Sequence, residues 1–230
     1  MRVGEEQTGV MTAMTESGKG DIYPWFARVM GLALIASVLQ VMITFAMTKD
    51  DFSYFNYWQY FTNQSNVMSA LLILYRWSPL YAATPTHIAR YESWRAAFVV
   101  FMSQTTFVYW ALLHGTFVIP DQMTYISSCF LHSGAFIYFL IDYLVAPPET
   151  EISLRNALYW FAYPFFYAVF IMVMAQFRSW YPYPFMDPAR SGSVRAVVIN
   201  ELVLCAIVIA VVLAVRATHN AWWRRRQNSN

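Results

Sequence analysis

Charged residues are scarce in this chain of 230 residues: Asp, Glu, Lys and Arg together make up 12% of it, and the formal net charge is only +2. This composition argues against a nucleic-acid-binding protein, because binding to phosphates needs a basic face that such a chain does not supply. Hydrophobic residues make up 58% of the chain and aromatic residues 19%, and the mean hydropathy is +0.38. The sequence is too apolar for an ordinary soluble domain and indicates an integral membrane protein.

Cysteine and histidine are also rare, with two and four residues respectively. Cys129 and Cys205 lie inside apolar segments, where a thiol behaves as a small apolar residue, so we expect no disulfide. The cysteines and histidines show no ligand-type spacing, so we expect no metal and no cofactor, although the sequence leaves open a cluster formed only in three dimensions. Residues 1–22 lack the apolar core of a cleavable signal peptide, and we predict a disordered cytoplasmic N-terminal tail there.

Long apolar segments carry the prediction of the fold. Each is about twenty residues long, which is enough to cross a hydrocarbon core of roughly 30 Å. Runs such as LVLCAIVIAVVLAV do not alternate, which excludes a transmembrane β-barrel. We therefore predict an all-α polytopic membrane protein whose domain, residues 23–216, is one bundle of six transmembrane helices at 24–47, 57–75, 94–113, 124–145, 157–176 and 194–215.

The distribution of Lys and Arg predicts the orientation of the bundle. Eleven of these residues fall on one side of the predicted spans and four on the other, so the positive-inside rule places both termini in the cytoplasm. Residues 217–230 form a basic cytoplasmic C-terminal tail that would bind an anionic leaflet. The eleven are Arg2, Lys19, Arg28, Arg76, Arg90, Arg95, Arg155, Arg216, Arg224, Arg225 and Arg226, and the four are Lys49, Arg178, Arg190 and Arg195.

A polar segment, YFTNQSN at residues 60–66, opens the second predicted span. Thr62, Ser65, Asn66 and Ser69 follow helical spacing and form one polar stripe, about 7 Å or more below the outer boundary of the membrane. Because unpaired amides are costly in hydrocarbon, the stripe should face the bundle interior or a wet cavity. Two interpretations remain open: hydrogen bonding between helices, or an active site.

His132, in the fourth predicted span, lies at nearly the same depth as Thr62. A histidine inside a membrane span is a functional candidate by default, and a purely structural, hydrogen-bonded histidine is the alternative. Asn200 and Glu201 of the last span also lie at comparable depth. Glu201 could orient the imidazole, could be protonated beside a buried amide, or could pair with Arg195 nearer the surface.

Two further features bear on the fold: an acidic residue within a span, and a proline-rich segment outside the spans. Asp142 lies near the cytoplasmic end of the fourth span, and we expect it to pair with a loop cation such as Arg155. The segment WYPYPFMDP, residues 180–188, lies on the same outer side as the polar residues. Alternating Pro and Tyr should make it a stiff extended connector packed at the interface, and a lid or an entrance for acyl chains is the alternative.

The polar residues suggest hydrolytic chemistry. A threonine hydroxyl is a weak nucleophile that needs a base within hydrogen-bonding reach, and a neutral imidazole can be that base. Thr62 and His132 fit such a pair, and the amides of Asn63, Gln64 or Asn66 could donate to a developing oxyanion. A site just below the headgroups suits an ester whose acyl tails remain in the bilayer, so a membrane lipid or lipid-like ester is the expected substrate.

Three stretches resemble a known family: YFTNQSN, FLHSGAFIYFLIDYLV and YWFAYPFFYAVFIMVMAQFRSWYPYPFMDP. They are similar to the bacterial Pr6Pr membrane proteins, distant relatives of the androgen-induced/FAR-like family, over residues 24–215. The resemblance implies a bacterial inner-membrane protein and a threonine hydrolase of fatty acid esters of hydroxy fatty acids, with an essential Thr and His that match Thr62 and His132. Phe136 stands where relatives commonly have proline.

Two functions are therefore predicted as alternatives. The first is an intramembrane lipid-ester hydrolase with Thr62 as nucleophile, His132 as general base, and supporting residues Asn63, Gln64, Ser65, Asn66, Asn200 and Glu201. The second is a non-enzymatic transporter or small-molecule-binding protein that uses the same polar cavity. Only one predicted span carries an internal proline, Pro164, and no repeat relates the two halves of the chain, which favours the enzyme.

Overall fold

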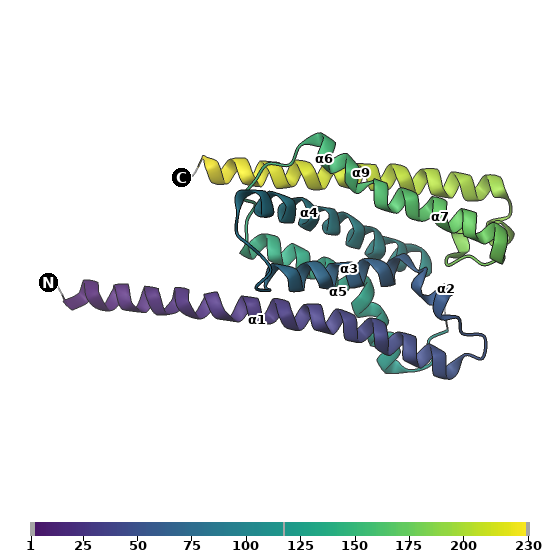
Figure 1. Cartoon of the computed structure of the whole chain (residues 1–230), viewed down its shortest axis with the longest axis horizontal. Helices are drawn as coiled ribbons and strands as arrows, with labels where there is room; N and C mark the ends of the chain where they lie inside the picture. The colour runs from purple at the N-terminus through teal and green to yellow at the C-terminus, as the bar shows by residue number, and fades with distance from the viewer. Residues whose placement is uncertain (1–2, 117, 229–230) are drawn as a thin grey trace.

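The computed structural model describes residues 3–116 and 118–228, and every regular element within these ranges is helical. Arg2 and the ends of both predicted tails lie outside the described residues. The long helices lie side by side in one bundle (Figure 1). The elements are α1 (Val3–Thr48), α2 (Tyr54–Trp58), α3 (Phe61–Arg76), α4 (Pro85–Val108), the π-helical turn η1 (Tyr109–Leu113), α5 (Gln122–Val145), α6 (Leu154–Trp160), α7 (Ala162–Arg178), the 3-10 turn η2 (Pro184–Met186), α8 (Pro188–Ser191) and α9 (Val194–Gln227).

The chain runs back and forth along the bundle, so both termini lie at the same end, on the left in Figure 1. We call this the terminal end, and the opposite end, which carries α2, η2 and α8, the distal end. α3 packs against α1 and α4, while α5 packs against α1 and α4 from another side. α4 also contacts α9 and is the most buried of the candidate spans, so it forms the centre of the bundle.

Five segments of the described chain are long and apolar enough to cross a membrane, which confirms the membrane character of the protein: Tyr23–Thr48, Pro85–Leu113, Gln122–Val145, Leu154–Arg178 and Val194–Gln227. The sixth predicted span, 57–75, differs from the expectation. The chain is extended at Tyr60, and α3 has 16 residues, or a length of about 24 Å at 1.5 Å per residue. Its crossing of the membrane therefore remains a prediction.

Helices α1 and α9 extend into the two segments that were predicted to be tails. α1 runs through residues 3–22, where the sequence predicted a disordered tail, although the candidate span begins only at Tyr23. This segment has no proline before Pro24, but it contains four of the eight glycines of the chain, so its intrinsic helix propensity is weak. At the other end, α9 continues to Gln227 and includes most of the basic tail.

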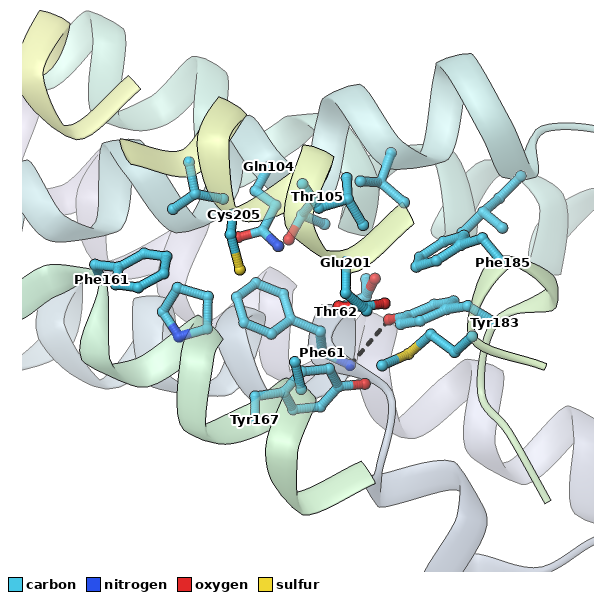
Figure 2. Close-up of a pocket in the computed structure, with 17 residues that line it drawn as sticks. Phe61, Thr62, Gln104, Thr105, Phe161, Tyr167, Tyr183, Phe185, Glu201 and Cys205 are labelled. Atoms are coloured by element: carbon cyan, nitrogen blue, oxygen red, sulfur yellow. Dashed lines mark hydrogen bonds between the residues drawn. The ribbon is translucent and has the colours of Figure 1, made fainter. Parts of the chain in front are cut away.

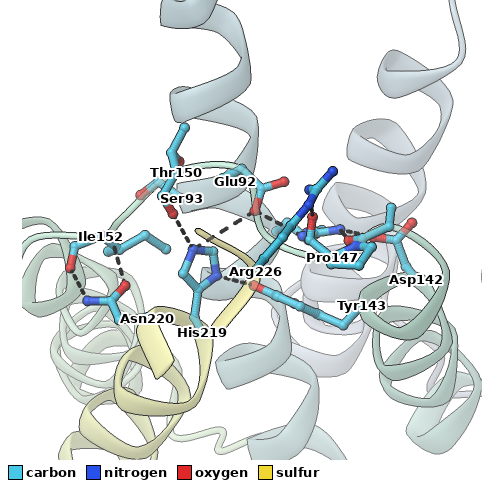
Figure 3. A network of polar contacts seen from close by, with 12 residues as sticks. Glu92, Ser93, Asp142, Tyr143, Pro147, Thr150, Ile152, His219, Asn220 and Arg226 are labelled. Atoms are coloured by element: carbon cyan, nitrogen blue, oxygen red, sulfur yellow. Dashed lines mark hydrogen bonds and ion pairs between the residues drawn. The ribbon is translucent and has the colours of Figure 1, made fainter. Parts of the chain in front are cut away.

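A buried charged cluster joins three helices near the terminal end (Figure 3). The Arg95 guanidinium of α4 lies 2.9 Å from both the Asp142 carboxylate of α5 and the Glu92 carboxylate one turn away. The Tyr23 hydroxyl of α1 donates to the second oxygen of Asp142. The predicted pairing of Asp142 with Arg155 is therefore wrong, because Arg155 is exposed and donates instead to Tyr159.

The same cluster fastens the connection between α5 and α6 to α9. His219 donates from Nε2 to the Thr150 carbonyl at 2.8 Å, and its Nδ1 accepts from the Tyr143 hydroxyl at 3.0 Å. Asn220 bonds both the N–H and the carbonyl of Ile152. The terminal end of the bundle is thus held by buried polar bonds as well as by apolar packing, as Figure 3 shows.

Candidate functional site

The YFTNQSN segment forms the first turns of α3 at the distal end, just after the break at Tyr60. The N-cap residue offers no side-chain bond, and the backbone N–H of Phe61 donates instead to the Tyr183 hydroxyl at 3.0 Å. Tyr183 belongs to the WYPYPFMDP segment, and burial raises the pKa of its phenol, so this hydroxyl stays protonated. Tyr183 and Met186 are both buried, so the segment is packed as expected, but Pro184–Met186 form the 3-10 turn η2 where an extended connector was predicted. The Tyr183 hydroxyl therefore fixes the start of α3.

Thr62 and His132 lie together between α3 and α5. Thr62 Oγ1 is 3.3 Å from His132 Nε2, and His132 Nδ1 is 2.6 Å from the Ser128 carbonyl oxygen. A carbonyl oxygen only accepts hydrogen bonds, so Nδ1 carries the proton and Nε2 presents its lone pair to Thr62. In the neutral ring the Thr62 hydroxyl is the donor. This is the arrangement in which an imidazole can take a proton from an alcohol.

The His132 ring stacks against an aromatic partner that the sequence pattern does not mark. Tyr109 stacks on it with ring centroids 3.7 Å apart and planes inclined by 15°. Tyr109 begins the π-helical turn η1, which interrupts the regular helix at the end of α4. Such turns are frequent at functional sites because the extra residue in the turn re-aims the side chains near it. No sequence pattern marks a π-helical turn, so the stacking of Tyr109 on His132 could not be predicted.

A cavity of about 250 Å³, the larger cavity, opens beside this pair, and both Thr62 and His132 line it. Its walls come from the end of α1, the connection to α2, the start of α3, η1 and the first turns of α5. Lys49 and Asp51 stand exposed on its lining, and Trp180 and Tyr183 line it from the WYPYPFMDP segment. The hydroxyl and the imidazole therefore face a space that a small polar group can enter.

The remainder of the polar stripe acts inside the bundle. Asn66 donates from one amide group to the carbonyls of Thr62, at 2.8 Å, and Leu131, at 2.7 Å, and so joins α3 to α5. The Ser65 hydroxyl lies 3.2 Å from the Thr62 carbonyl and 3.3 Å from Thr105 Oγ1 of α4. Both side chains are buried, and neither lines the larger cavity. The stripe thus combines the two open interpretations: Thr62 faces the cavity, and the residues below it bond helices together.

The two amides next to Thr62 differ in direction. Asn63 lines the larger cavity and spends one N–H on the Tyr57 carbonyl at 2.7 Å, which leaves its second N–H for another acceptor. Gln64 lies away from this cavity, since it donates to the Trp58 carbonyl and accepts from the Tyr163 hydroxyl. Both N–H groups of Asn66 are already engaged by carbonyls. Of the predicted oxyanion donors, only Asn63 remains suited to that role.

Glu201 lines a second, smaller cavity of about 50 Å³ on another side of Thr62 (Figure 2). Thr62 and Tyr183 line both cavities, whereas His132 lines only the larger one. Within the described chain, the ion pairs do not include Glu201, so the predicted pairing with Arg195 is not formed. Asn200 donates to the Phe185 carbonyl at 3.1 Å and lines neither cavity, so it anchors the connector instead of the site.

In the part of the chain that the structure describes, His, Cys, Asp and Glu side chains do not gather in threes as a metal site would require. No family model matches the chain, and no curated protein or solved structure is significantly similar to it. The site must therefore be judged on its own geometry.

Replacing Asn66 by leucine is expected to lower the free energy of unfolding by about 1–3 kcal/mol, because a buried amide loses two hydrogen bonds: one within α3 and one to α5. Unfolding of the purified protein in mixed detergent and dodecyl sulfate measures this change. Ser69→Ala is the matched control on the same face: the Ser69 hydroxyl is buried and without a hydrogen-bond partner in the described structure, so its loss should change stability by less than about 0.5 kcal/mol. Equal losses in both variants would contradict the structural role of Asn66.

Proposed function

We propose that this chain hydrolyses a lipid-like ester within the membrane, with Thr62 as the nucleophile and His132 as the general base. The observation that carries the proposal is the 3.3 Å contact between Thr62 Oγ1 and the unprotonated Nε2 of His132, on the wall of a cavity. That distance is slightly longer than an ideal catalytic hydrogen bond, which is common before a substrate binds.

The proposed reaction begins with transfer of the hydroxyl proton of Thr62 to His132 Nε2. The Thr62 oxygen attacks the carbonyl carbon of the ester, and the resulting oxyanion collapses to an acyl-Thr62 ester. The leaving alcohol takes the proton from His132 as the bond to it breaks, so the ring returns to its neutral form. The Nδ1 bond to the Ser128 carbonyl stabilises the protonated ring between these two transfers, since it remains a donor throughout.

Two groups on the cavity wall can donate to the oxyanion. Asn63 has one N–H that the Tyr57 carbonyl does not use, and the Tyr183 hydroxyl is protonated and lines the same cavity. A donor of this kind contributes about 3 kcal/mol to transition-state stabilisation in known hydrolases. We propose Asn63 and Tyr183 for this role, in place of Gln64 and Asn66.

The size and place of the larger cavity support a lipid-like substrate. At about 250 Å³ it is smaller than the 300–1,000 Å³ typical of sites that enclose a whole ligand. It can take the ester group while acyl tails stay in the bilayer. We propose that the distal end faces away from the cytoplasm, with α3 as a sixth span, in a bacterial inner membrane. The resemblance to the Pr6Pr proteins and their relatives further suggests an ester of the fatty acid–hydroxy fatty acid type.

A covalent probe tests the proposal directly. We expect a fluorophosphonate to react with the purified protein in detergent: Thr62 Oγ1 attacks phosphorus, fluoride leaves, and His132 takes the hydroxyl proton. Peptide mass spectrometry should place the phosphonate on Thr62, at one group per chain. Heat-denatured protein is the first control, because labelling should need the folded pair.

The position of the label decides between the two functions. A phosphonate on another residue would remove Thr62 from the role of nucleophile. Folded protein that takes up no phosphonate would favour a transporter or binding protein in which the same cavity is a vestibule.

A further inference from the structure

The smaller cavity raises a question that the first half-reaction leaves open, namely how the acyl group leaves Thr62. This cavity lies among α3, α4, α7 and α9, and most of its wall is apolar, from residues such as Phe61, Val108, Leu204 and Val208. Figure 2 shows the Glu201 carboxyl and the Tyr183 hydroxyl gathered beside Thr62, with Gln104 further along the cavity. Burying a carboxyl group in an apolar wall costs free energy unless a hydrogen-bonding partner compensates for it.

Two oxygen atoms in this wall are buried acceptors without a donor. Glu201 Oε1 and Gln104 Oε1 are shielded from solvent, and neither has a hydrogen-bond partner in the described part of the chain. Leaving such atoms unpaired is costly, so the cavity is suited to a small molecule that donates hydrogen bonds. At about 50 Å³ it has room for a water molecule, which needs a cavity of about 10–15 Å³, and it is a fifth of the volume of the larger cavity.

We propose that Glu201 and Gln104 hold the hydrolytic water, and that Glu201 is the general base for hydrolysis of the acyl-Thr62 ester. The inference rests on the proposed function, because it needs an acyl group on Thr62. Thr62 lines both cavities, so the acyl carbonyl attached to its Oγ1 can be approached from the smaller one while the acyl group occupies the larger one. His132 lines only the larger cavity and serves the first half-reaction.

Hydrolysis of the acyl-Thr62 ester needs only water and the Glu201 carboxylate. Water donates one proton to the Glu201 carboxylate while its oxygen forms a bond to the acyl carbon, and the carbonyl becomes an oxyanion. When the oxyanion collapses, the bond between the acyl carbon and Thr62 Oγ1 breaks, and that oxygen takes the proton from Glu201. The products are a free carboxylic acid and the original Thr62 hydroxyl, and Glu201 is again a carboxylate.

The test separates the two half-reactions with p-nitrophenyl octanoate and purified protein in detergent. Nitrophenol release reports formation of the acyl-Thr62 ester, and intact-protein mass reports how much of it accumulates. For Glu201→Gln we expect a burst of about one nitrophenol per chain at the wild-type rate, followed by turnover about 10²-fold slower and an octanoyl group on Thr62. Hydroxylamine should release that group, because its nitrogen attacks without a base.

Two more variants complete the design. Gln104→Leu removes the second acceptor at a similar side-chain volume, so it should slow the second step about tenfold and leave the burst unchanged. Glu149→Gln is the matched control, since Glu149 is exposed on the connection at the terminal end, and it should behave as the wild type.

Each result decides between the hypotheses. Wild-type turnover in Glu201→Gln would overturn the assignment of the base while leaving the Thr62–His132 pair intact. Equal loss of burst and turnover would overturn it as well, because that pattern belongs to a residue that only holds the structure. If the wild-type protein forms no ester on Thr62 and hydrolyses nothing, the proposed function fails, and this inference fails with it.

Discussion

Alanine at position 62 should reduce ester hydrolysis to the uncatalysed rate while the bundle stays folded. The side chain of Thr62 makes its contact with His132 Nε2, whereas the bonds from Ser65 and Asn66 go to the backbone carbonyl of Thr62 and survive the substitution. Loss of one hydroxyl therefore removes the proposed nucleophile and little of the packing. Hydrolysis of p-nitrophenyl octanoate, measured beside thermal unfolding of the same preparations, checks both statements.

Substitution of His132 should act through the same step. Without the proposed base the Thr62 hydroxyl would keep its proton. A general base contributes about 10²–10⁴-fold to a rate, so His132→Ala should lose that much activity. The double variant Thr62→Ala, His132→Ala should be no worse than Thr62→Ala alone, because the two groups act as a unit. Losses that multiply in the double variant would show that the two residues contribute independently.

Two control substitutions, one beside the site and one at the far end of the bundle, test whether the effects are specific to Thr62 and His132. Ser128→Ala should retain activity, because His132 bonds the backbone carbonyl of Ser128 and not its side chain. Thr218→Ala removes an exposed threonine at the terminal end and should have no effect.

The meeting of Thr62 and His132 is the part of the site that the sequence could predict. Helical rise and the predicted span boundaries place both residues at one depth, and the cost of burying them turns both toward the interior. Their 3.3 Å contact follows from α3 and α5 lying side by side. The directions of Asn63 and Gln64 could not be predicted, because they bond the carbonyls of Tyr57 and Trp58, which precede the break at Tyr60. That of Asn66 depends on how closely α5 approaches α3, since it bonds the Leu131 carbonyl.

Breaks in helices account for the other differences. A break in a helix or one extra residue in a helical turn leaves the mean hydropathy of a segment unchanged. The hydropathy pattern therefore does not show that the segment 57–75 divides at Tyr60, or that η1 is a π-helical turn. Burial of Arg95 was missed for a related reason. A basic residue near a predicted span end is expected to reach the interface, and only the neighbouring Glu92 and Asp142 make the interior a better place for it.

Arg95→Met should therefore destabilise the protein strongly, by about 3–5 kcal/mol of unfolding free energy, because Glu92 and Asp142 would be left as buried carboxylates without their cation. The substitution also removes the bond from Arg95 to the Ala146 carbonyl at the end of α5. Since the cluster lies toward the terminal end and Thr62 lies in the first turn of α3, at the distal end, activity per folded chain should change little at low temperature. Unfolding in mixed detergent and dodecyl sulfate gives the free energy.

Two causes of the lower stability of Arg95→Met can be distinguished: the unpaired carboxylates and the lost packing of the arginine side chain. Arg155→Met removes an exposed arginine whose one hydrogen bond within the described residues goes to the Tyr159 hydroxyl, and it should change stability by less than about 0.5 kcal/mol. Adding Glu92→Gln and Asp142→Asn to Arg95→Met neutralises the stranded carboxylates and should restore part of the loss, because a buried neutral group is far cheaper than an unpaired charge. If the triple variant is less stable than Arg95→Met, the carboxylates are not what the arginine compensates, and its packing against Tyr143, 4.0 Å from the ring centroid, becomes the better explanation.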